Sequence, residues 1–294
     1  MAVVAAARII EMQTLQVRKL EREEHIRTRK LWEEIFAEDT PEFLDYYYSV
    51  KVKENEIYVI EDEGEIVSML HLNPYSMRIH DTVYQTHYIV AVATDERYRR
   101  QGLMAKLLNH AMHVMKERKE PFTFLMPASE AIYRPFGFEF VYEQERGKIV
   151  GKKADGMEVA FALATEAECE EIAAFANEIL KNYDVATVRS ASYYQMMLFE
   201  QRSENGGILL ARCGEKLAGV FCFAKEEHIE VREPLFVDES LLYQAAHYLA
   251  GNESEEVSCI GWGNEKKPII MAKVLCPELV GNLKNMKVFL NEVV

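Results

Sequence analysis

Two arginines and a glycine stand between an apolar run and a helical pattern, in the sequence Arg99-Arg-Gln-Gly102. The residues from Tyr88 to Ala93 are apolar, which predicts a buried strand. After Gly102, apolar residues recur at helical spacing, at Leu103, Met104, Leu107, Leu108, Ala111, Met112, Val114 and Met115. The free N–H groups of a first helical turn carry partial positive charge and bind anions, most often phosphate. We therefore predict an anion-binding turn, with an ordinary strand-to-helix connection as the alternative.

Histidines and cysteines give weaker signals for chemistry. His110 and His113 stand three apart in the predicted helix, as a metal pair would, but no third ligand is evident, so we expect no metal. His71 suits either an acid or base of a pocket or a strand histidine whose hydrogen bonds are satisfied. The five cysteines form no CxxC pair and no nucleophile motif. They indicate a reduced, cytoplasmic protein without a disulfide framework.

The composition limits the classes of partner. The chain has 294 residues and a formal net charge of −14. This charge argues against non-specific binding to nucleic acid and against an anionic membrane surface. No apolar run is long enough to cross a membrane as a helix. The acidic balance favours a small cationic substrate.

The elements that must position the turn form a mixed sheet with helices. Two strands are expected around Glu63-Gly64, a hairpin signal, and a long meander leads from them into the strand before Arg99. Two helices are expected earlier, from Glu21 and from Glu42. The fold class is therefore α/β (α+β), with a mostly antiparallel mixed sheet flanked by helices.

The second half of the chain repeats the first. The segment Tyr58–Leu70, with its Gly64-Glu65 turn, aligns with Ile208–Val220 and its Gly214-Glu215 turn. A strand and a helix come before the hairpin in both halves, which favours an internal duplication. The second half has no basic glycine turn before its helix near Glu239. The second copy is therefore expected to be degenerate, with the anion site in the first copy alone.

Two motifs resemble those of the GNAT (GCN5-related N-acetyltransferase) superfamily. Arg99-Arg-Gln-Gly102-Leu-Met104 is similar to its acetyl-CoA motif, and Leu125–Phe138 is similar to its strand, helix and Tyr followed by Gly-Phe. The bulky Met104 departs from the general motif and resembles the Eis-like (enhanced intracellular survival) branch. The second half also resembles the degenerate second copy of Eis-like proteins. We expect the protein to lack the third, sterol-carrier-like domain of that branch, because the sequence ends at Val294.

The resemblance implies acetyl-CoA as the acetyl donor, and it places Tyr133 beside the coenzyme sulfur. A phenol is a suitable proton donor to the leaving thiolate, so Tyr133 is the candidate catalytic acid. An aromatic plug beside Phe136 and Phe138 is the alternative role for Tyr133. The residues expected to bind the coenzyme are Val90, Ala91, Val92, Arg99, Arg100, Gln101, Gly102, Leu103, Met104, Ala105 and Ser129.

The acceptor pocket is expected against the first helices and the hairpin. Aromatic residues and carboxylates together suit a cationic amine. Glu33, Glu34 and Asp39 are acids that would attract it, although core packing and a solvated helix face also explain such residues. The candidate acceptor contacts are Trp32, Phe36, Tyr46, Tyr47 and Met69. The general base stays open between water, a side-chain carboxylate and the carboxylate of Val294.

The expected activity is direct N-acetylation of a small cationic amine, such as a polyamine, an aminoglycoside or a lysine-like group. The alternatives are a protein N-acetyltransferase and a non-catalytic acyl-CoA-binding sensor. Oligomeric state is left open, with a homo-oligomer as one outcome. The expected segments are an N-terminal extension (1–13), a catalytic domain (14–150), a linker (151–156), a degenerate second domain (157–270) and a C-terminal tail (271–294).

Overall fold

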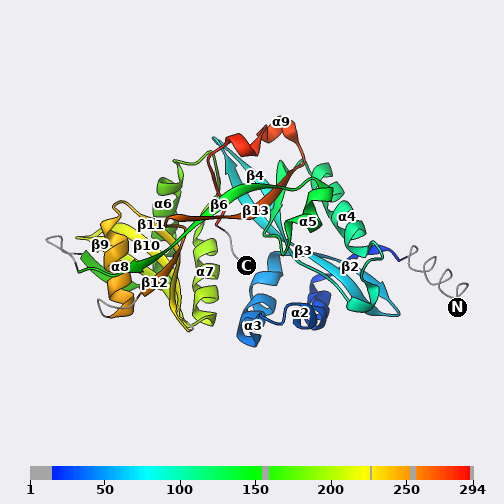
Figure 1. Cartoon of the computed structure of the whole chain (residues 1–294), viewed down its shortest axis with the longest axis horizontal. Coiled ribbons are helices and arrows are strands. Elements are labelled where there is room, and N and C mark those ends of the chain that lie inside the picture. Colours follow the sequence, from blue (N-terminus) through cyan, green and yellow to red (C-terminus); the bar gives the residue numbers. More distant parts are fainter. Residues whose placement is uncertain (1–14, 154–158, 226, 252–255, 292–294) are drawn as a thin grey trace, which may run out of the picture.

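The computed structural model describes residues 15–153, 159–225, 227–251 and 256–291. The expected N-terminal extension, much of the linker and Val294 lie outside these residues. The described chain forms two halves side by side, joined by long strands that run through both (Figure 1). No helix in the described part of the chain is long and apolar enough to span a membrane.

Five strands and four helices build most of the first half. The strands are β1 (Val17–Lys19), β2 (Glu56–Asp62), β3 (Glu65–Ile79), β4 (Thr82–Thr94) and β5 (Phe122–Leu125). The helices are α2 (Arg29–Ile35), α3 (Pro41–Ser49), α4 (Leu103–Glu117) and α5 (Glu130–Tyr133). Strand β6 (Glu139–Val150) then leads into the second half.

The second half repeats this order. Its strands are β7 (Val159–Leu163), β8 (Val185–Thr187), β9 (Gly207–Cys213), β10 (Lys216–Lys225), β11 (Ile229–Phe236) and β12 (Glu256–Ile260). Its helices are α6 (Cys169–Leu180), α7 (Ala191–Ser203) and α8 (Ser240–Ala250). Strand β13 (Glu265–Val274), helix α9 (Pro277–Val280) and strand β14 (Val288–Phe289) follow.

The described strands form one continuous sheet, whose main path has the order β1-β2-β3-β4-β5-β13-β6-β12-β11-β10-β9-β7. Off this path, β8 pairs antiparallel with β3 and parallel with β14, and the pairs discussed next are those of the main path. Most neighbouring pairs are antiparallel, whereas β4–β5 and β11–β12 are parallel. The two parallel pairs occupy equivalent places in the two halves, and the predicted hairpins are β2–β3 and β9–β10. The mixed α/β fold with a mostly antiparallel sheet is therefore confirmed.

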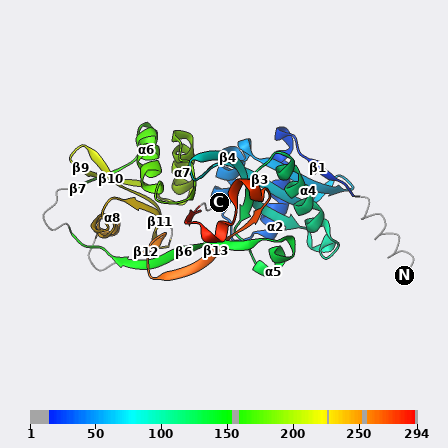
Figure 2. The ribbon, with the colours of Figure 1, turned by 90° about the horizontal axis from the view of Figure 1, so that it is seen from above.

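Helices cover both faces of the sheet in each half (Figure 2). In the first half, α4 packs on one face of β2 and β3, through residues such as Leu107 and Leu108. Helices α2 and α3 pack on the opposite face, where Trp32 and Tyr47 are buried. The second half has α6 and α7 on one face and α8 on the other. Because helices cover both faces of the sheet, the strand residues that point to either face are apolar.

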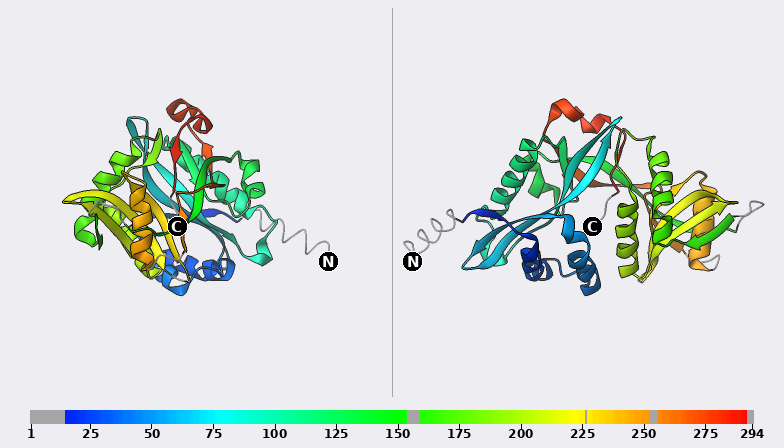
Figure 3. Two further views of the ribbon diagram at one scale, coloured as in Figure 1. Left: turned by 60° about the vertical axis from the view of Figure 1, so that its left-hand side comes forward. Right: turned by 180° about the vertical axis from the view of Figure 1, so that it is seen from behind.

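Strand β13 belongs to the sheet of both halves. Its residues pair with β5 from Met271↔Leu125 to Val274↔Phe122, and with β6 from Glu265↔Arg146 to Ala272↔Glu139. The boundary expected at residue 270 therefore falls inside a strand, and the segment expected as a tail completes the sheet of the first half. The tip of the β3–β4 hairpin also reaches the second half, where Met77–Ile79 pairs with β8 (Figure 3).

Candidate active site

The turn after β4 places a helix N-terminus toward solvent. Gly102 is the N-cap of α4 with φ +81°, and the preceding Arg100 also has a positive φ of +62°. The N–H groups of Leu103, Met104 and Ala105 have no carbonyl partner within the helix, because helical bonding begins one turn later. A cavity of about 420 Å³ lies at this turn, and Gly102 and Arg99 both line it. The turn therefore has the geometry and the charge of an anion site.

A bulge interrupts β4 just before this turn. The pairing of β3 with β4 passes from Met69↔Ala93 to His71↔Val90, so β4 has one residue more than β3 across this step. Ala91, inside the bulge, has φ +51°, which is unfavourable for a residue with a side chain. A bulged residue is left out of the ladder, so its backbone groups are available to another partner.

Beyond the bulge, β4 and β5 separate. The two parallel strands share the pair Tyr88↔Phe124 and then diverge. A second cavity of about 280 Å³ opens here, lined by Val90, Ala91 and Val92 of β4 and by the loop after β5. Val92 lines both cavities, so they are neighbours along β4. The arrangement suits a long ligand with an anionic end at α4 and a reacting end at the bulge.

Tyr133 lies in the wall of the second cavity. It is 7% exposed, and its ring packs edge-on against Phe138 with 5.9 Å between ring centroids. Its hydroxyl forms no hydrogen bond with the described residues. Burial raises the pKa of Tyr133 to about 12, so the hydroxyl stays protonated at neutral pH. Tyr133 is therefore a buried, protonated phenol in the cavity wall.

Trp32, Phe36 and Asp39 form the opposite wall of the second cavity. The indole Nε1 of Trp32 donates a hydrogen bond of 2.7 Å to Asp39 Oδ2. Burial raises the pKa of Asp39 above its ordinary value, and the charges of Glu38 and Glu204 add to this rise. The Trp32 N–H opposes the rise because it stabilises the carboxylate. A carboxylate beside aromatic rings gives this wall an affinity for cations.

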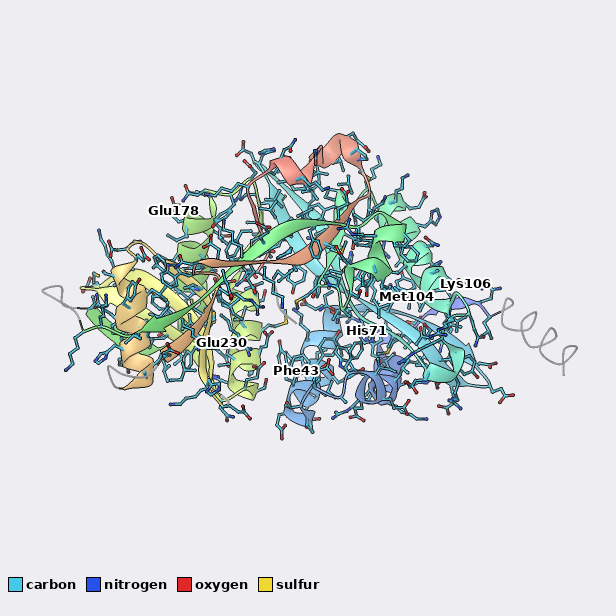
Figure 4. The ribbon with its side chains drawn as sticks, viewed as in Figure 1. Phe43, His71, Met104, Lys106, Glu178 and Glu230 are labelled. Atoms are coloured by element: carbon cyan, nitrogen blue, oxygen red, sulfur yellow. The ribbon has the colours of Figure 1, made fainter. Side chains whose placement is uncertain are left out.

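The structure brings most of the predicted coenzyme residues together. Gln101 and Ser129 line neither cavity; both are exposed, and the Gln101 Nε2 donates to the Arg97 carbonyl oxygen at 3.1 Å. The predicted residues that do line them are Val90, Ala91, Val92, Arg99, Arg100, Gly102, Leu103, Met104 and Ala105. Met104 lies at the beginning of α4 (Figure 4).

Three of the predicted acceptor contacts lie elsewhere. Tyr47 and Met69 are 0% exposed in the core behind Trp32, so we correct them from acceptor contacts to core residues. Tyr46 points to the second half, where its hydroxyl lies 3.4 Å from Glu200 Oε2. Trp32 and Phe36 are the two predicted aromatic residues that line the cavity. The sequence pattern alone does not show that Trp32 and Phe36 line a cavity whereas Tyr47 is a core residue.

None of the described residues that line this cavity is a histidine. His71 is fully buried on β3, where its Nδ1 lies 3.0 Å from the Tyr47 hydroxyl (Figure 4). Burial lowers the pKa of His71 to about 3, so its ring is neutral. The ring of His110 packs against that of Tyr58, with 5.2 Å between centroids. Among the described residues, no group of three or more His, Cys, Asp or Glu side chains could hold a metal ion.

In the second half, β11 and β12 diverge as β4 and β5 do, but a side chain fills the space between them. Strands β11 and β12 pair at Val231↔Cys259 and then separate. The side chain of Asn291 enters this place, where its Nδ2 donates to the Arg232 carbonyl oxygen at 2.8 Å. Its Oδ1 accepts a hydrogen bond of 2.6 Å from Gln144 Nε2. The space that is open in the first half is therefore occupied by the chain itself in the second.

Comparisons with solved structures agree with this fold. A protein of Enterococcus faecalis V583 described as a probable N-acyltransferase is 17% identical, with TM-score 0.77 over 89% of this chain and 73% of that one. Eis1 of Mycobacterium abscessus is 11% identical, with TM-score 0.64 over 89% and 74%. A tandem GNAT protein from the clavulanic acid biosynthesis pathway is 12% identical, with TM-score 0.57 over 89% and 98%. At such identities the likeness concerns the fold alone.

The family comparison concerns the half that holds both cavities. No curated protein matches the chain. Residues 16–141 match the family model described as an acetyltransferase (GNAT) domain. This range contains the bulge of β4, the turn at Gly102 and Tyr133. Over residues 16–141, the first half of the chain is therefore similar to an acetyltransferase (GNAT) domain.

Proposed function

We propose that the protein is an acetyl-CoA-dependent N-acetyltransferase that acts on a small cationic amine. The observation that carries this proposal is the pair of cavities that meet at Val92. One cavity ends at the basic turn with its free helix N–H groups, and the other holds a buried phenol opposite a carboxylate. Acetyl-CoA has a pyrophosphate at one end and a reactive thioester at the other, which suits this order.

The basic turn, the first turn of α4 and the backbone of β4 together hold the donor. The N–H groups of Leu103 to Ala105 receive the pyrophosphate, and Arg99 and Arg100 add positive charge. The backbone of β4 from Val90 to Val92 binds the pantetheine arm. A bulge N–H released from the ladder polarises the thioester carbonyl, and such donors are worth about 10²–10³-fold in rate. Bound acetyl-CoA supplies the acetyl group itself.

The second cavity handles the amine and the protons. Asp39, held by Trp32, attracts the ammonium form of the acceptor into the cavity. The ammonium first loses a proton to water, and the resulting neutral amine attacks the thioester carbon. The C–N bond forms, the C–S bond breaks, and Tyr133 gives its proton to the departing thiolate. The second proton leaves the new amide nitrogen through water and restores the Tyr133 hydroxyl. A polyamine, an aminoglycoside or a lysine-like group would carry the required charge. We also propose a cytoplasmic location, because unpaired cysteines are typical of a reducing compartment.

Release of the coenzyme thiol from acetyl-CoA, measured with a panel of amines, tests the proposal. The panel contains a diamine, spermidine, an aminoglycoside, a lysine amide, a neutral amine and a lysine-containing peptide. Turnover with the small cationic amines supports the proposal, and turnover with the peptide alone supports a protein N-acetyltransferase. Tight binding of acetyl-CoA with no turnover on any acceptor would instead identify a sensor.

A further inference from the structure

The second cavity has a closed end at the point where β4 and β5 meet. The pair Tyr88↔Phe124 is the bridge between these strands, and Phe124 is fully buried. The cavity lies on the diverging side of this bridge, between Val90–Val92 and Met126–Ala128. Tyr88 itself lines the cavity and is 2% exposed. A ligand that runs along β4 from the turn toward the bridge therefore ends at Tyr88.

The wall at Tyr88 is supported from behind by other aromatic rings. The ring of Phe124 has its centroid 5.1 Å from that of Tyr88, and the ring of Tyr75 is 6.5 Å away. Lys51 places its ammonium group 5.1 Å from the centroid of the Tyr75 ring. Rings packed in this way move little, because a close-packed interior has no empty space to receive them.

We propose that Tyr88 is the end wall that restricts the acyl donor to short acyl groups such as acetyl. This inference rests on the proposed function. The turn at Gly102 fixes one end of the donor, so its thioester lies at the bulge around Ala91. Only Ile89 and Val90 separate Ala91 from Tyr88 along the strand. Acyl carbons beyond the first few would meet the Tyr88 ring at the closed end of the cavity.

Binding of two non-hydrolysable thioethers, S-ethyl-CoA and S-hexyl-CoA, tests the wall by isothermal titration calorimetry without any acceptor. The wild type is expected to bind S-ethyl-CoA more tightly than S-hexyl-CoA. Tyr88→Ala is expected to improve S-hexyl-CoA binding by about 10-fold or more, since apolar pockets discriminate added methylenes by such factors. Tyr88→Phe keeps the ring and is expected to keep the wild-type preference.

Tyr84→Ala is the matched control, because Tyr84 lies on the same strand but does not line this cavity. It is expected to leave the preference unchanged. If Tyr88→Ala does not fold, Tyr88→Leu shortens the wall while filling more of the core and serves for the same comparison. Thermal unfolding of each variant shows that a folded protein is being measured.

The outcomes separate this inference from the proposed function. Tight binding of both thioethers to the wild type would overturn the end wall and leave the proposed function intact. An equal change of preference in Tyr84→Ala would also overturn it, because the effect would then come from general loosening. Failure of the wild type to bind S-ethyl-CoA at all would overturn the proposed function, and with it this inference.

Discussion

The Trp32 indole N–H and the Asp39 carboxylate are joined by a hydrogen bond of 2.7 Å in the wall of the second cavity. Asp39→Asn keeps the size of the side chain but removes the charge that attracts an ammonium group. We expect KM for the amine to rise about 10–100-fold, the range for losing a hydrogen bond to a charged group. Acetyl-CoA affinity, measured by titration, should stay unchanged.

Glu38→Gln serves as the control for Asp39→Asn, since Glu38 is an exposed acid in the same wall. Its effect on KM should be much smaller.

The hydrogen-bonded pair of Trp32 and Asp39 makes a prediction about pH. Trp32→Phe removes the donor that stabilises the charged carboxylate, so the pKa of Asp39 should rise further. The acidic limb of the pH profile of kcat/KM should then move to higher pH. An unmoved limb would show that Asp39 does not govern it.

The hydroxyl of Tyr133 makes a prediction about kcat. Tyr133→Phe should lower kcat by about 10²–10⁴-fold, the usual contribution of a general acid. The coenzyme should still bind, because the ring and its contact with Phe138 remain. Because the pKa of Tyr133 is raised to about 12, its titration should contribute no loss of activity between pH 7 and pH 9. Wild-type rates in Tyr133→Phe would remove the acid role and leave the fold unaffected.

The backbone at Gly102 makes a prediction about binding of acetyl-CoA, with a control that carries the same strain. Gly102 has φ +81° and Gly64, in the β2–β3 turn, has φ +84°, and a Cβ at either would meet no atom within 4 Å. Valine at either position therefore strains the backbone by roughly 1–2 kcal/mol or more. Gly102→Val should weaken binding of acetyl-CoA about tenfold or more, whereas Gly64→Val should lower stability alone. Calorimetric titration separates the two.

The sequence predicts part of this site well because its signals are local. The strand, turn and helix around Gly102 follow from apolar spacing and one glycine, and the structure has them as β4 and α4. The bulge at Ala91 depends on how β4 pairs with β3, which no local pattern encodes. Trp32 and Tyr47 are aromatic residues of two successive helices that pack into one core cluster, and only the packing determines that Trp32 also lines a cavity.

The contact between Tyr46 and Glu200 makes a prediction about stability. Burial raises the pKa of Glu200 to about 7 from its ordinary value of 4.5. The folded state therefore binds a proton more tightly than the unfolded state, and stability falls as pH rises from 4.5 through 7. Glu200→Gln, which resembles the protonated form, should stabilise the protein at pH 8 by about 1–3 kcal/mol and not at pH 4.

Urea unfolding at the two pH values measures this difference. Glu178→Gln is the control, because Glu178 is an exposed glutamate on α6, well separated from α3 (Figure 4). Its effect should be small at both pH values, as is usual for an exposed ion pair such as the one that Glu178 forms with Lys181. An equal increase in the free energy of unfolding at pH 4 and pH 8 for Glu200→Gln would contradict the raised pKa of Glu200.

The placement of β13 has a consequence for the order of events on the ribosome. Strand β5, which leads to the loop of the second cavity, shares one pair with β4 and is otherwise held by β13. Residues 265–274 leave the ribosome long after residues 122–125. Strand β5 therefore cannot pair with β13 until most of the chain has been synthesised. Domains usually fold as they emerge, the N-terminal one first. Here the N-terminal half must finish last, and a nascent chain stalled before residue 265 should lack the finished cavity.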